Sequence, residues 1–120
     1  MRLALPVGTT IVAGHRGVHR RVEWVSVLNT RPPAFPDLVG GEIALLSLDA
    51  MRLLSDKLTL PSLVRDLAEM DVAAIGVVGE VSAQAQSVAE DAGIPLLRLP
   101  DTTSLRDTER QIAQTLMGSP

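Results

Sequence analysis

The sequence predicts a single α/β domain in which helices pack on a parallel or mixed sheet, with β-α-β units from about residue 42 onward. Short apolar runs typical of buried strands alternate with longer segments whose apolar residues recur at helical spacing. Glycine and proline mark where these segments end. The chain has 120 residues, is 46% hydrophobic and shows no repeat or internal linker, so we expect one domain over residues 1–120.

The N-terminal third favours two strands. Residues 9–13 are rich in β-branched side chains, and two glycines punctuate the turn that follows. Residues 22–28 carry valine on both faces of the expected strand, which predicts that this strand is largely buried. A proline-rich loop over 31–37 and the pair Gly40-Gly41 lead into the next segment.

After the glycine pair the order of elements becomes regular. Residues 43–48 form an apolar run that predicts a buried strand, and residues 49–58 make a helical or irregular connection. Pro61 falls in the first turn of a helix expected over 61–70, where its missing N–H is harmless. A short apolar strand over 73–78 suits the centre of a parallel sheet.

The C-terminal third continues with helix, strand and helix. Ser82 is a suitable N-cap for a helix that is expected to end at Gly93. Residues 96–99 form another short strand. Ser104 then begins the last helix, with Asp107 in the position that glutamate takes in a capping box.

Composition excludes several classes of protein. Without cysteine the chain has no disulfide, thiol nucleophile or thiolate metal ligand. Its apolar runs are shorter than the roughly 18 residues of a membrane span and no signal sequence is recognisable, so we expect a cytoplasmic protein with no membrane contact. The formal net charge is -3, and basic residues cluster only over 15–21, so we expect no direct nucleic acid binding by this chain.

No catalytic or metal-binding constellation stands out. His15 and His19 are four residues apart, but Gly17 between them argues against a helix that would align them on a metal. Ser47 and Asp49 lack a histidine base, and no nucleotide-binding loop occurs. We therefore expect no enzyme activity, no metal and no cofactor.

One candidate ligand site lies where the expected parallel strands end. Ligands of α/β sheets bind beyond the carboxyl ends of such strands, near helix N-termini with unpaired N–H groups. Leu48 and Asp49 stand at the end of one expected strand, with Ser47 just before them, and residues 79–82 and 100–104 follow the next two. The alternative is that the hydroxyl residues in these segments act only as helix caps.

A second candidate site surrounds the proline-rich loop. An arginine there could pair with an anionic ligand and a phenylalanine could cover an apolar ring. The simpler alternative is that the phenylalanine fills the edge of the core, the arginine is solvated and the glycines serve a turn with positive φ. The candidate residues of this site are Asn29, Thr30, Arg31, Phe35, Gly40 and Gly41.

Several motifs run along nearly the whole chain. They are Trp24-Val25, Pro36-Asp37, Gly40-Gly41-Glu42, residues 67–77 and residues 92–100. Over about residues 5–116 the chain resembles the N-terminal domain of the purine catabolism regulator (PucR-type) family of bacterial transcription factors. The resemblance implies a sensory or regulatory domain that binds a small-molecule effector, purine-related or otherwise nitrogenous, or mediates dimerisation, with the DNA-binding region outside this chain.

The resemblance also implies a homodimer, since regulators that read paired half-sites are usually dimers. A Leu- and Val-rich sheet with an uncovered face or edge favours the same state. Two alternatives stay open at this point. The chain could be a dimerisation module without a ligand, or the substrate-binding domain of a small or multidomain enzyme resembling the N-terminal domains of Mur ligases.

Overall fold

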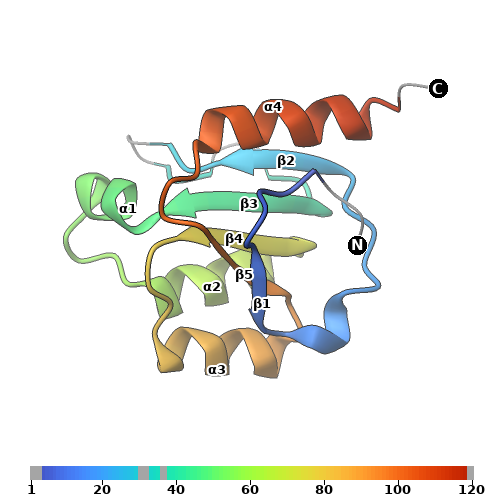
Figure 1. Ribbon diagram of the computed structural model, residues 1–120. Helices are drawn as coiled ribbons and strands as arrows, with labels where there is room; N and C mark the ends of the chain where they lie inside the picture. The colour runs from blue at the N-terminus through green and yellow to red at the C-terminus, as the bar shows by residue number, and fades with distance from the viewer. Residues whose placement is uncertain (1–3, 30–32, 36–37, 119–120) are drawn as a thin grey trace.

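The computed structural model describes residues 4–29, 33–35 and 38–118, and shows a mixed five-stranded sheet between helices (Figure 1). In sheet order the strands are β1 (Thr10–Ala13), β5 (Leu96–Leu99), β4 (Ala74–Val78), β3 (Glu42–Ser47) and β2 (Trp24–Val27). The helices are the 3-10 helix η1 (His15–Gly17), α1 (Leu48–Leu54), α2 (Leu60–Glu69), α3 (Ala83–Ala92) and α4 (Leu105–Leu116). The predicted α/β class is therefore confirmed.

Strand directions follow from the connections. β2, β3, β4 and β5 are parallel, whereas β1 joins β5 in the antiparallel direction. Parallel neighbours need a crossover, and helices provide it between β3 and β4 and between β4 and β5. The β-α-β units predicted from about residue 42 onward are thus present.

The two faces of the sheet are covered differently. Ala44 and Leu46 of β3 belong to a core cluster with α2 and α3, and Ile43 and Leu45 belong to a second cluster with α4. This division follows from the alternation of side chains along a strand. Two helices cover one face and α4 alone lies across the other (Figure 1).

Hydroxyl side chains begin the four α-helices. Ser47, Thr59, Ser82 and Ser104 each accept a hydrogen bond from the backbone N–H three residues later. Each such cap stabilises a helix by about 1 kcal/mol. The caps predicted at Ser82 and Ser104 are confirmed, and at Ser104 the donor is the N–H of Asp107, at 3.2 Å.

Strand β2 departs from the sequence-based expectation of a largely buried strand. It forms an edge of the sheet, and although Val25 is buried, Trp24 is 46% exposed. The prediction was wrong because valine on both faces indicates that a strand packs well. It does not indicate whether the strand has one neighbour or two.

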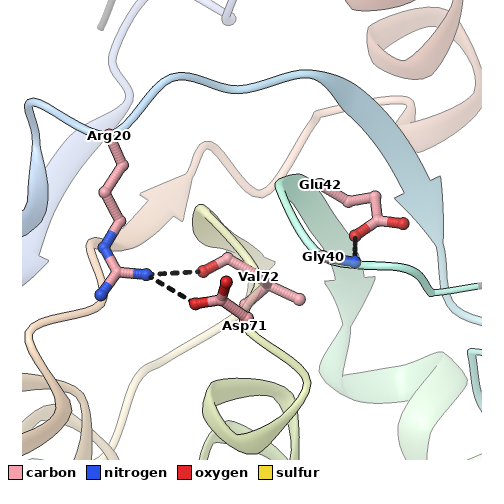
Figure 2. A network of polar contacts seen from close by, with 5 residues as sticks. All are labelled: Arg20, Gly40, Glu42, Asp71 and Val72. Atoms are coloured by element: carbon pink, nitrogen blue, oxygen red, sulfur yellow. Dashed lines mark hydrogen bonds and ion pairs between the residues drawn. The ribbon is translucent and has the colours of Figure 1, made fainter.

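The turn before β3 is held by a buried carboxylate (Figure 2). Gly40 and Gly41 have φ angles of 104° and 88°, a region that favours glycine, as predicted. The carboxylate of Glu42, a residue that is only 4% exposed, accepts hydrogen bonds from the N–H groups of Val39 at 2.8 Å and Gly40 at 2.9 Å. Glu42, the first residue of β3, therefore fixes the turn that precedes this strand.

A second polar contact in Figure 2 joins the segment before β2 to the segment before β4. Nη1 of Arg20 lies 3.4 Å from a carboxylate oxygen of Asp71 and 3.5 Å from the carbonyl oxygen of Val72. The carbonyl of Asp71 also accepts the N–H of Gly41, at 2.9 Å. These contacts join the segments that precede β2, β3 and β4, at the amino ends of the three parallel strands.

Candidate functional site

A cleft of about 610 Å³ opens at the carboxyl ends of β3 and β4. Three segments line it, and they are residues 47–49 with Arg52, residues 78–83, and Asp101. The structure therefore brings together the ends of three neighbouring parallel strands, as expected for a ligand site in an α/β sheet. Two of the candidate residues, Ser47 and Asp49, lie in this cleft.

The hydroxyl groups of the cleft have a structural role. Oγ of Ser47 accepts the N–H of Ala50 at 3.0 Å, and Oγ of Ser82 accepts the N–H of Ala85 at 3.2 Å. A cap uses only the acceptor side of a hydroxyl, and each hydroxyl keeps its proton for donation. Capping and contact with a ligand are therefore compatible at both serines.

The charges in the cleft are mainly negative. Asp49, Glu80 and Asp101 face a single cation, Arg52, which already pairs with Asp49 at 3.5 Å. Asp101 lies 4.0 Å from Nη2 of Arg98, whereas Glu80 has no ion-pair partner among the described residues. The cleft thus favours ligand groups that donate hydrogen bonds over anionic groups.

Arg52 was not singled out from the sequence. Residues 49–58 carried no clear helical signal, so the position of each side chain around that connection was not predicted. In the structure, residues 48–54 form α1, which places Arg52 one turn after Asp49. The sequence did contain one signal for Arg52. It is three residues from Asp49, a spacing at which an acidic and a basic side chain are neighbours on a helix.

The other candidate residues lie elsewhere. Asn29 lines a smaller groove of about 260 Å³ along the free edge of β2. Phe35 is 7% exposed and belongs to the core cluster with α2 and α3, so it fills the core. Gly40 and Gly41 precede β3, at the opposite end of that strand from the cleft.

Two candidates, Thr30 and Arg31, and the motif Pro36-Asp37 lie outside the described residues. In the parts of the chain that are described, no helix combines the length and apolar character needed to cross a membrane. Those same parts contain no group of three or more acidic or histidine side chains arranged to hold a metal ion.

Comparison with protein-family models identifies a family. Residues 2–116 match the model named PucR, described as the purine catabolism regulatory protein-like family. The match spans the three segments that form the cleft as well as the edge strand β2. A search of curated proteins found no match.

Proposed function

The chain belongs to the purine catabolism regulatory protein-like (PucR) family, and on this premise we propose that it is the sensory domain of a cytoplasmic transcriptional regulator of catabolic genes. Its ligand would be a small metabolite bound in the cleft at the carboxyl ends of β3 and β4. The effect of ligand binding would then be transmitted to a DNA-binding region outside this chain. The proposal includes no catalytic step.

The convergence of hydroxyls and carboxylates in the cleft carries this proposal. Ring and amide N–H groups of a purine-related or other nitrogenous metabolite would donate to Glu80 and Asp101. Its carbonyl groups would accept from the hydroxyls of Ser47 and Ser82. Such a ligand matches the excess of acceptors in the cleft without adding a negative charge to it.

Thermal unfolding with a panel of purine bases and ureides tests the proposal. A compound that binds the folded state raises the melting temperature, and at a concentration of about 100 times its Kd it stabilises the fold by about 2.7 kcal/mol. Glu80→Lys should abolish the shift, whereas Glu69→Lys, on α2 and outside the cleft, should leave it unchanged. If no compound shifts the wild-type transition, the cleft is not a site for this class of ligand.

We further propose that the domain self-associates. The sheet ends in an exposed strand edge at β2, and a transcriptional regulator that reads two half-sites needs a symmetric pair of subunits. The mass in solution tests this part separately from ligand binding. Light scattering at micromolar concentration should give about twice the 12.8 kDa of one chain.

A further inference from the structure

The two edges of the sheet differ in how they are protected. At the β1 edge the register with β5 shifts between Ile11 and Ala13, which is the kind of irregularity that discourages further pairing. At the other edge, each residue of β2 pairs in regular register with β3. β2 has four residues and is therefore short, but it contains no charged residue and no proline, and no other described segment pairs with its outer side, which can serve as a template for another strand.

The side chains of β2 suit such a contact. Val25 and Val27 belong to the cluster with α4, so Trp24 and Ser26 lie on the opposite face of the sheet. Trp24 is the only tryptophan of the chain and is 46% exposed. It lines the groove of about 260 Å³ that follows this edge, together with the rest of the strand.

No residue of β2 is acidic, so the strand itself carries no negative charge that would discourage pairing at this edge. Glu23, the residue before β2, turns toward the start of β3, where one of its carboxylate oxygens lies 2.9 Å from the position that a Cβ on Gly41 would take. A charged side chain on the strand is one of the devices by which edge strands avoid pairing. β2 lacks this device.

We propose that β2 pairs antiparallel with β2 of a second copy across a two-fold axis, so that one sheet continues through the dimer. The inference rests on the self-association proposed above and names its surface. A two-fold contact uses the same patch on both subunits and closes after two copies, whereas repeated edge addition would produce fibres.

The strand is complementary to itself in this arrangement. With the axis beside Val25, Trp24 of each copy lies opposite Ser26 of the other, a large side chain beside a small one. The two Trp24 side chains become diagonal neighbours, about 7–8 Å apart at the backbone, which is within reach of aromatic rings. Both would become buried, and the groove along the edge would be filled.

Charges beside the strand are complementary as well. Glu109 of α4 lines the same groove, and Arg106 lies one turn earlier on that helix. Neither has an ion-pair partner among the described residues. The two-fold axis brings the α4 helices of both copies to the same side of the sheet in antiparallel directions, so that Glu109 of one approaches Arg106 of the other.

Two readouts on the wild-type chain test the surface directly. Sedimentation velocity from about 0.1 to 100 μM gives the dimer dissociation constant, and the emission of the single tryptophan reports whether Trp24 becomes buried. We expect the emission maximum to shift to longer wavelength on dilution, with the same midpoint as the loss of mass. A dimer whose dissociation leaves the emission unchanged would overturn the proposal.

Ser26→Lys keeps the tryptophan and introduces a charge at the edge. It should weaken the dimer at least tenfold, whereas Ile11→Lys, an exposed apolar position on the opposite edge strand, should not. If Ser26→Lys proves unfolded by circular dichroism, Trp24→Lys serves in its place for the mass measurement. Equal dimer constants for the wild type and either folded β2 variant would refute the β2 surface.

These outcomes separate the proposals from one another. A wild-type chain that is monomeric up to about 100 μM contradicts self-association as a whole, since typical specific contacts hold at micromolar concentration. A stable dimer whose dissociation constant is unchanged by the substitutions in β2 contradicts only the β2 surface. Effector binding is measured independently, because the thermal shift should persist in the monomeric Ser26→Lys variant.

Discussion

Gly14 packs directly against the backbone carbonyl of Ile94, with no room between them for a side chain. Gly14 also has a φ of 71°, and its N–H donates to a carboxylate oxygen of Glu90 at 3.0 Å. The residue that follows β1 is thereby fixed against the end of α3 and the turn into β5. Two requirements, positive φ and close approach, meet at this one position.

Gly14→Ala should therefore destabilise the fold severely, by about 3 kcal/mol or more, because the backbone near Ile94 must move to admit a methyl group. Gly40→Ala is the matched control. It also has positive φ, but its Cβ would meet nothing closer than 3.7 Å, so only about 1–2 kcal/mol is expected. Urea unfolding of both variants measures the difference in stability. Equal midpoints would show that the backbone near Ile94 moves to admit the methyl group at little cost.

Glu42→Gln should destabilise the domain by about 1–3 kcal/mol. The carboxylate accepts two backbone N–H groups while almost fully buried, and an amide offers only one acceptor oxygen in its place. Glu69→Gln, at an exposed position, should change the free energy of unfolding by less than about 0.5 kcal/mol. Chemical denaturation of the pair isolates the buried contacts, and a negligible effect of Glu42→Gln would mean that the turn before β3 is held by other means.

The chain alone should form no sequence-specific complex with DNA. Its formal net charge is -3, and two arginines of its basic segment already contact backbone or acidic groups, Arg16 at the carbonyl of Asp91 and Arg20 at Asp71. A gel-shift assay at about 100 mM salt, near physiological ionic strength, measures this. A specific complex under that condition would place the DNA-binding surface within this domain.

Most elements could be predicted because their signals are local. Caps at Ser82 and Ser104, the end of α3 at Gly93 and the apolar run of β5 each depend on residues within one turn or strand. The edge position of β2 could not be predicted in this way. It depends on which strands lie beside it in space, and neighbouring residues do not encode that order.

The candidate sites show the same limit. The rule of sheet topology placed Leu48 and Asp49 at the carboxyl end of a parallel strand, and both line a cleft there together with Ser47. Asn29 and Phe35 were grouped because they are close in sequence, but one lines the free edge of β2 and the other fills the core. Proximity along a loop therefore did not translate into a shared site.

The pairing of β1 with β5 has a consequence for the order in which the chain folds. Thr10 and Ile11 belong to the first of the described strands in sequence order, yet their partners Arg98 and Leu97 belong to the last of them. Contacts between distant residues form late and slow folding, because the loop between them must first be closed. On the ribosome β1 would therefore wait without a partner while the parallel strands assemble, and its docking would be the step that completes the native sheet.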